Sequence, residues 1–166
     1  MKKLSCLALL ILSTTAFAYT PAQLLQFQNT GTCPGCDLSN AYLIVTNMNI
    51  VSPYNLQGAN ISDSTYETQN NTGSNFSNII AFNTAFDGYS FTQSNFQNAL
   101  LKNAIFANTN LQYADFTGAD ITGANFNNAN LYRAKGLNLT ASNTVCNAIL
   151  PDGSTGKCGT RSNKPI

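Results

Sequence analysis

The stretch that decides the fold is ADFTGADITGANFNNANL, residues 114–131, in which a large apolar residue recurs at every fifth position. The same phase extends back to Leu56. The residues in phase are Leu56, Ile61, Tyr66, Asn71, Phe76, Ala81, Phe86, Phe91, Phe96, Leu101, Phe106, Leu111, Phe116, Ile121, Phe126 and Leu131. A helix repeats every 3.6 residues and a strand every two, so this period predicts a chain that turns a corner every five residues.

Two further positions repeat with the same period. Two residues before each centre the side chain is usually Ala, Ser or Thr, and two residues after it Gly or Asn is common, as at Gly118 and Asn128. Gly and Asn tolerate the positive φ that a type II turn requires at its third residue. Each quintet therefore predicts a short inward-facing segment followed by a turn, and four quintets predict a coil of twenty residues.

This tandem pattern resembles the pentapeptide-repeat family. The quintets that carry the resemblance most clearly are Ala114-Asp115-Phe116, Ala119-Asp120-Ile121, Ala124-Asn125-Phe126 and Ala129-Asn130-Leu131. The resemblance implies an all-β fold, a right-handed quadrilateral β-helix of about 4–5 coils. The spacing persists loosely at Leu38, Leu43 and Met48, and Val51-Ser52-Pro53 then shifts the phase by three residues.

A coil of twenty residues stacks positions that are twenty apart. It predicts an aromatic core ladder made of Phe76, Phe86, Phe96, Phe106, Phe116 and Phe126. Asn71 interrupts the apolar centres, and Gln69 stands where a small residue is usual. We therefore interpret residues 67–73 as a bulging loop, with a regular coil as the alternative.

The sequence divides into four segments. Residues 1–18 read as a secretory signal peptide: Lys2-Lys3, an apolar run over 4–12, and Ala16-Phe17-Ala18 as the cleavage signal. Cleavage after Ala18 predicts a periplasmic or secreted protein, and no later segment is expected to span a membrane. Residues 19–32 are the expected N-terminal cap, a short helix with Leu24, Leu25 and Phe27 on its apolar side. The β-helix is expected over 33–136, and a hairpin cap and tail over 137–166.

Composition excludes several chemistries. The chain has no His, so catalytic arrangements built on His are impossible and a mixed Cys/His zinc site is excluded. Removal of Lys2 and Lys3 with the signal leaves six basic residues against seven acidic ones. That balance is too sparse for a nucleic-acid footprint, and no nucleic-acid partner is expected. We expect no catalytic residue, metal or cofactor.

Export leaves four cysteines, Cys33, Cys36, Cys146 and Cys158, and an even number favours disulfides. Three pairings are possible. Cys146 and Cys158 flank Pro151-Asp152-Gly153, a strong turn signal, so they can face each other across a hairpin. That leaves Cys33 with Cys36. The Cys33-Pro34-Gly35-Cys36 motif also allows a redox interpretation, but it lacks the βαβ setting of thioredoxin-like dithiols.

Apolar residues are rare at the outward positions of the repeat, yet four fall there: Ile80, Phe82, Leu100 and Ile105. Contiguous apolar surface of this kind marks a contact with a protein partner or a second copy, unless a cap or the 67–73 segment covers it. The favoured function is thus an exported, non-enzymatic structural or protein-interaction module. The alternatives are an envelope thiol-redox protein that uses the CxxC motif and a DNA-mimicking topoisomerase-binding protein.

Overall fold

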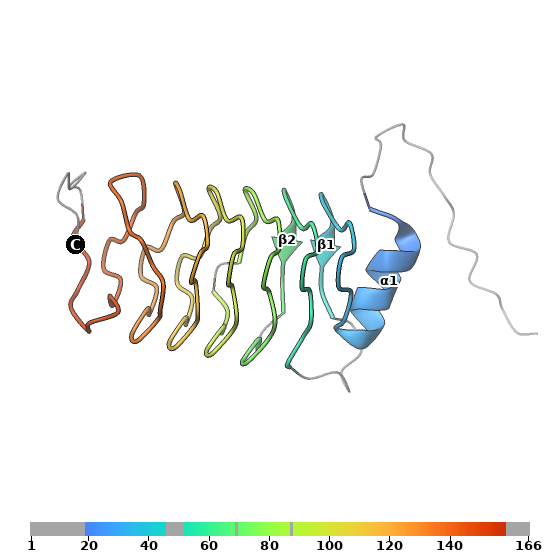
Figure 1. The fold of residues 1–166 in the computed structure, drawn as a ribbon, viewed down its shortest axis with the longest axis horizontal. Coiled ribbons are helices and arrows are strands. Elements are labelled where there is room, and N and C mark those ends of the chain that lie inside the picture. The colour runs from blue at the N-terminus through green and yellow to red at the C-terminus, as the bar shows by residue number, and fades with distance from the viewer. Residues whose placement is uncertain (1–18, 46–51, 69, 87, 159–166) are drawn as a thin grey trace, which may run out of the picture.

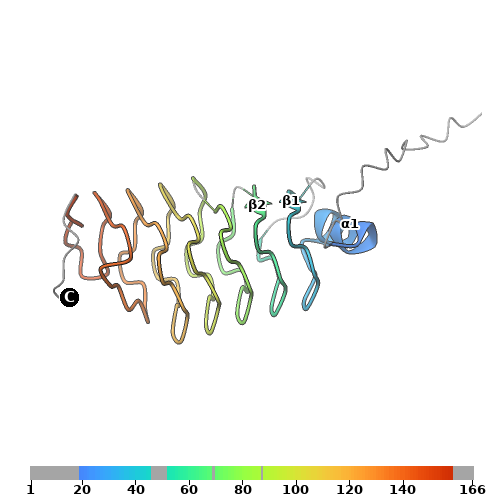
Figure 2. The same cartoon turned by 90° about the horizontal axis from the view of Figure 1, so that it is seen from above.

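The computed structural model describes residues 19–45, 52–68, 70–86 and 88–158. They form an elongated stack of coils with helix α1 (Pro21–Thr30) across one end and the last described residues, up to Cys158, at the other (Figures 1 and 2). The expected signal peptide, residues 1–18, lies outside the described residues. The architecture of the described part is mostly β.

The walls are built from parallel pairing between successive coils. Strand β1 (Tyr42–Leu43) pairs in parallel with β2 (Thr65–Tyr66), and single parallel bridges join the other coils. The bridges lie in four columns, which we call A to D. Column A contains Asn55, Asn75, Asn95, Asp115 and Lys135; column B, Asn60, Ile80, Leu100 and Asp120; column C, Thr65, Ala85, Ile105 and Asn125; column D, Asn70, Ser90, Asn110 and Asn130. Partners within these columns are twenty residues apart, as the sequence predicts.

The phase shift before Leu56 is also confirmed. Thr32 bridges Asn55 and Asp37 bridges Asn60, so these partners are separated by twenty-three residues instead of twenty. The three extra residues are absorbed between the first two coils, and pairing resumes in the same columns. Three extra residues between two coils therefore leave the register of the described columns unchanged.

The turns between columns follow from residues that tolerate positive φ. Between columns A and B, for example, the Ala99 N–H donates to the Phe96 carbonyl at 3.1 Å, and Asn98 has φ 56°. The Asn98 N–H then donates to the Thr117 carbonyl of the next coil at 3.0 Å. Each turn is thus closed by its own hydrogen bond and is bonded to the equivalent turn of the next coil. Gly and Asn recur at this position because the turn requires positive φ there.

The interior is filled by two ladders of stacked rings. Phe96 stacks on Phe76 and Phe116 at centroid distances of 4.9 and 5.0 Å, nearly parallel to both. Phe106 stacks on Phe86 and Phe126 at 4.7 and 5.4 Å, with interplanar angles of 3°. The two ladders meet edge to face, since the Phe96 and Phe106 rings are 5.6 Å apart at 86°. All six rings are fully buried, and each contributes roughly 1.5–3 kcal/mol of transfer free energy before entropy is counted.

The loop interpretation of residues 67–73 is wrong for the part that the structure describes. Asn70 bridges Ser90, and the Asn71 N–H donates to the Ser90 carbonyl at 2.8 Å, so the wall is regular here. Asn71 is fully buried, and its amide oxygen accepts hydrogen bonds from the Tyr66 and Thr68 hydroxyls. Its amide N–H donates to the Thr68 carbonyl at 2.8 Å. Asn71 can occupy a core position because its polar atoms are paired inside the coil.

Helix α1 closes the first coil. Thr20 caps its N-terminus by accepting from the Gln23 N–H at 3.3 Å, and Gly31 ends it with φ 66°. Phe27 is fully buried and its ring lies 6.1 Å from that of Tyr66. Leu25, expected on the apolar side, is instead 57% exposed, because it lies about 200° around the helix from Phe27.

Stacking continues beyond residue 136, the expected end of the coils. Asn125 bridges Thr144 and Asn130 bridges Ile149, with a spacing of nineteen residues. Buried Ala148 and Leu150 extend the core into this segment. The chain then reverses, and Ile149 pairs antiparallel with Thr155. The C-terminal cap is therefore one further partial coil that ends in a short hairpin.

Candidate interaction site

The four outward apolar residues lie on two neighbouring columns of the wall, and we call them the wall patch: Ile80, Phe82, Leu100 and Ile105. Ile80 and Leu100 are bridged partners in column B, so their side chains are adjacent. Ile105 lies in column C, one turn after Leu100, and Phe82 occupies the turn that follows Ile80. Leu100 is 39% and Ile105 38% exposed, whereas Ile80 and Phe82 are half-buried.

No described segment covers the wall patch. Helix α1 lies across the end of the stack, and the coil through Asn71 is part of the regular wall (Figure 1). The two ways in which the sequence allowed the patch to be internal are thus not realised by the described residues. Leu100 and Ile105 remain as apolar surface on a wall whose other bridge positions are mostly Asn, Asp, Ser or Thr.

The surroundings of the wall patch are polar. In column B the patch is flanked by Asn60 on one side and Asp120 on the other. The Lys102 ammonium lies 3.6 Å from the Asp120 carboxylate, and the two side chains are 55% and 35% exposed. Such a pair contributes little to stability. The wall patch is therefore a small apolar centre with a polar rim.

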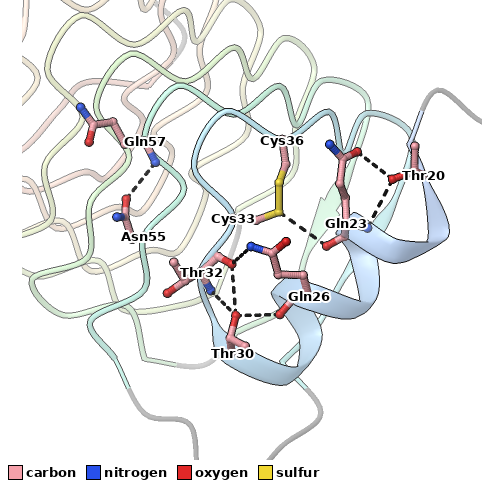
Figure 3. Close-up of a disulfide and its surroundings, with 9 residues drawn as sticks. All are labelled: Thr20, Gln23, Gln26, Thr30, Thr32, Cys33, Cys36, Asn55 and Gln57. Carbon is pink, nitrogen blue, oxygen red and sulfur yellow. Dashed lines mark hydrogen bonds between the residues drawn. A yellow bond between two sulfur atoms is a disulfide. The ribbon is translucent and has the colours of Figure 1, made fainter.

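Cys33 and Cys36 lie beneath helix α1, with their sulfur atoms within bonding distance and their Cα atoms 5.5 Å apart (Figure 3). Cys33 is fully buried and Cys36 is 7% exposed. The Cys33 sulfur is 3.6 Å from the Gln23 carbonyl oxygen, and the Gln26 amide donates to the Thr32 carbonyl at 3.1 Å. A dithiol covered in this way is poorly placed for exchange with an external substrate, which requires access to the attacked sulfur.

Cys146 and Cys158 are the second pair, with Cα atoms 4.2 Å apart across the C-terminal hairpin. Their sulfur atoms are also within bonding distance. The pairs therefore sit at opposite ends of the stack, and the four cysteines do not converge. No group of three or more Cys, Asp or Glu side chains within the described residues could hold a metal ion.

The carboxylates of Asp115 and Asp120 accept hydrogen bonds that stabilise the turns after them. The Asp115 carboxylate accepts from the Thr117 N–H at 2.9 Å and from its hydroxyl at 2.6 Å, and this hydroxyl lowers the pKa of Asp115. Hydrogen bonding to Thr122 likewise lowers the pKa of Asp120. Both groups are held as ordinary ionised turn residues and not as a catalytic acid and base, for which one pKa must be raised.

One group of residues was not singled out from the sequence. Tyr113, Tyr132 and Arg133 meet at the turn between columns D and A, where the Arg133 guanidinium lies over both rings. The signal that could have found them is the presence of Tyr113 and Arg133 at positions where the repeat usually carries Gly or Asn.

Comparison with known proteins identifies the repeat. The family model described as "Pentapeptide repeat region" matches residues 59–135. Residues 59–135 are a pentapeptide repeat region. The resemblance drawn from the quintets is thereby confirmed, and the residues at every fifth position from Leu56 to Leu131 are all buried. The comparison with curated proteins gives no match.

Solved structures of pentapeptide-repeat proteins are similar to this chain. One from the thylakoid lumen of Arabidopsis thaliana shares 25% identity over 66% of this chain and 85% of its own, with a TM-score of 0.47. Rfr23 from the cyanobacterium Cyanothece 51142 shares 23% over 78% and 90%, with a TM-score of 0.33. QnrB1, a plasmid-mediated fluoroquinolone resistance protein, shares 19% over 77% and 81%, with a TM-score of 0.40.

Proposed function

We propose that the chain is an exported, non-enzymatic protein-interaction module, and that the wall patch is where its partner binds. The observation that carries the proposal is the exposure of Leu100 and Ile105 beside Ile80, on an otherwise polar wall. Apolar side chains held on a rigid, regular surface can be buried by a partner without a conformational change, which lowers the cost of binding. The partner is a protein with a complementary apolar face, either another protein or a second copy of this chain.

The fold that presents this surface is, in our proposal, a right-handed quadrilateral β-helix. The four bridge columns and the twenty-residue offset support four sides per coil. The proposed boundaries are the signal peptide 1–18, the cap 19–32, the coils 33–136 and the C-terminal cap and tail 137–166, with coil-like pairing reaching into the last segment. No helix among the described residues is long and apolar enough to cross a membrane.

Export to the periplasm or the medium rests on the residues of the signal segment and on the cysteines. Four cysteines in two pairs at bonding distance suit an oxidising compartment. Peptide mapping of the exported protein without reduction should recover Cys33 linked to Cys36 and Cys146 linked to Cys158. Free thiols after export, or cross-linked pairs, would contradict this assignment.

The experiment for the wall patch uses residues that the same columns already contain. In the variant L100N/I105N, columns B and C gain the Asn that they already contain at Asn60 and Asn125, and no new charge faces Asp120, so the fold should be kept. The matched control is Asn110→Asp in column D. Mature wild-type and variant proteins are compared by analytical ultracentrifugation and by cross-linked capture from periplasm and culture medium.

Loss of self-association or of a captured partner in L100N/I105N, with retention in the control, supports the proposal. If the variant unfolds, the patch is a folding element. If association and capture are unchanged, the patch is not the contact surface, and the proposed function fails at this site.

A further inference from the structure

The turn between columns D and A departs from the rule that all other turns follow. Outside this turn, every described residue with positive φ is Gly, Asn or Asp. In three successive coils of this turn the position is held by Gln93, Tyr113 and Arg133, with φ of 60°, 60° and 59°. Residues with large side chains are strained in this conformation, and such strain gathers at sites with a function.

Two of these residues meet a third side chain above the wall. The rings of Tyr113 and Tyr132 are 6.3 Å apart at 78°, and the Arg133 guanidinium carbon lies 5.8 Å and 5.3 Å from their centroids. We call Tyr113, Tyr132 and Arg133 the turn cluster. The coils bring it together, because the Tyr113 N–H donates to the Tyr132 carbonyl at 3.1 Å. The guanidinium thus contacts the faces of two rings from successive coils.

The turn cluster does little for the core. Tyr113 is 43% exposed and Arg133 is exposed, so burial in the core does not offset the conformational cost of either residue. Hydrogen bonding to Tyr132 raises the pKa of Arg133, a side chain that is positively charged at any ordinary pH. The ion pair found among the described residues is Lys102 with Asp120 and does not involve Arg133. Asp152, in the following coil, accepts from the Ser154 N–H and hydroxyl at 2.9 and 2.6 Å.

We propose that the turn cluster binds a carboxylate of an acidic segment of a partner protein. A planar guanidinium presents parallel N–H groups that match a carboxylate in a bidentate pair. Tyr and Arg are also the side chains most enriched among residues that dominate protein binding. The net charge of this end of the molecule also favours an acidic ligand. From Leu131 to Cys158 the chain carries three basic residues, Arg133, Lys135 and Lys157, against Asp152 alone. The site lies on a different turn from the wall patch and can be tested separately.

The test uses the mature protein and a capped hexaglutamate peptide as the probe. Binding is followed by the NMR signal of the Arg133 side-chain Nε–Hε group and by backbone amides of the turn cluster. Arg133→Asn places the residue that the repeat prefers at this turn and should weaken binding at least about tenfold. The matched control, Lys135→Asn, removes the same charge two residues away and should change binding by less than about threefold. Arg133→Lys keeps the charge but not the planar fork, and it should also weaken binding clearly.

Thermal unfolding separates this role from a structural one. If the turn cluster exists for binding, Arg133→Asn and Tyr113→Asn relieve strained positions, and their Tm should equal or exceed that of the wild type. A lower Tm in both variants would show that the turn cluster holds the turn together and would overturn the proposal. So would equal weakening by Lys135→Asn and Arg133→Asn, or a stronger response to dextran sulfate than to the peptide at equal charge.

Discussion

At the scale of single residues, Asn71 shows how a polar side chain becomes part of this core. It occupies a position that Phe91, Leu111 and Leu131 fill in later coils, yet it is fully buried. The Tyr66 hydroxyl donates to its amide oxygen at 2.8 Å. Burial raises the pKa of Tyr66 far above its ordinary value, so this phenol is always a donor. Tyr66 and Asn71 form a hydrogen-bonded pair, and the Thr68 hydroxyl donates to the same amide oxygen.

This pairing predicts a non-additive response to mutation. Asn71→Leu alone leaves the Tyr66 hydroxyl buried without its acceptor and should destabilise the fold by about 1–3 kcal/mol. Tyr66→Phe added to Asn71→Leu removes that hydroxyl, so the double variant should recover part of the loss. The remainder reflects Thr68, whose buried hydroxyl also donates to the Asn71 amide oxygen. Urea unfolding of both single variants and the double variant gives the coupling free energy. Additive losses would show that the two side chains do not act as a pair.

The carboxylates of the turns predict a particular acid response. Hydrogen bonding to Thr117 and to Thr122 lowers the pKa of Asp115 and of Asp120 in the folded state. A carboxyl with a lowered folded pKa stabilises the fold above its unfolded pKa, about 3.9 for Asp, and this contribution is lost as the pH falls through the folded pKa. We therefore expect Tm to decrease below about pH 4.

The matched variant is D115N/D120N. Asn performs the same turn role at Asn125, whose amide oxygen accepts from the Asn127 N–H at 3.0 Å, but it does not titrate. The decrease in Tm between about pH 4 and about pH 2 should be smaller in the variant than in the wild type. Calorimetric scans of both proteins across that pH range measure the decrease in Tm. An identical decrease would mean that other groups cause the acid response.

At the scale of elements, two glycines with the same backbone conformation serve different purposes. Gly58 has φ 67° and Gly136 has φ 69°. A Cβ at Gly58 would meet nothing within 4 Å, whereas one at Gly136 would lie 2.3 Å from the Thr117 backbone nitrogen. Gly58 is needed for its turn alone; Gly136 also lets the chain pass close to the preceding coil.

Ala substitutions should separate the two requirements. Gly58→Ala should cost about 1–2 kcal/mol from the left-handed conformation. Gly136→Ala carries the same conformational cost and a clash with backbone besides, so it should cost several times more or prevent folding. Chemical denaturation of the two variants makes the comparison. Equal losses would mean that the coil at Gly136 can move away from Thr117.

The stacked rings predict that position within a ladder determines the cost of a cavity. Phe106 is stacked on both sides, by Phe86 and Phe126. Phe106→Ala should cost about 3–5 kcal/mol. Phe126→Ala should cost less, because Phe126 stacks face to face on Phe106 alone among the described rings. The reverse order in urea unfolding would argue against the ladder as the source of this stability.

The coils could be predicted from the sequence because two independent signals share one period: the apolar centres and the turn residues. The same two signals predict the position of the three-residue shift, since both resume together at Leu56. The coil through Asn71 could not be predicted, because its regularity depends on hydrogen bonds from Tyr66 and Thr68 and not on apolar character. The turn cluster could not be predicted for a related reason. Tyr113 and Arg133 are visible as exceptions to the repeat, but their meeting with Tyr132 depends on how adjacent coils stack.

At the scale of the whole molecule, the stack has two unlike ends. The first coil is closed by α1, with Phe27 inserted against Tyr54 and Tyr66. The last is closed by a hairpin carrying Cys146 and Cys158. The wall between them offers its apolar patch on columns B and C and its Arg-centred turn cluster between D and A. One rigid body thus separates two proposed contacts, and a partner could occupy either without blocking the other.

The twenty-residue offset shared by most of the bridges has a mechanical consequence. Neighbouring coils are joined by backbone hydrogen bonds that run along the long axis, so tension applied to the two ends loads them directly and peels coils from one end. Each coil that detaches releases twenty residues, roughly 65–70 Å of contour length. Stretching a single molecule in an optical trap should therefore give a series of nearly equal steps of that size. A single large extension would show instead that the coils share load and rupture together.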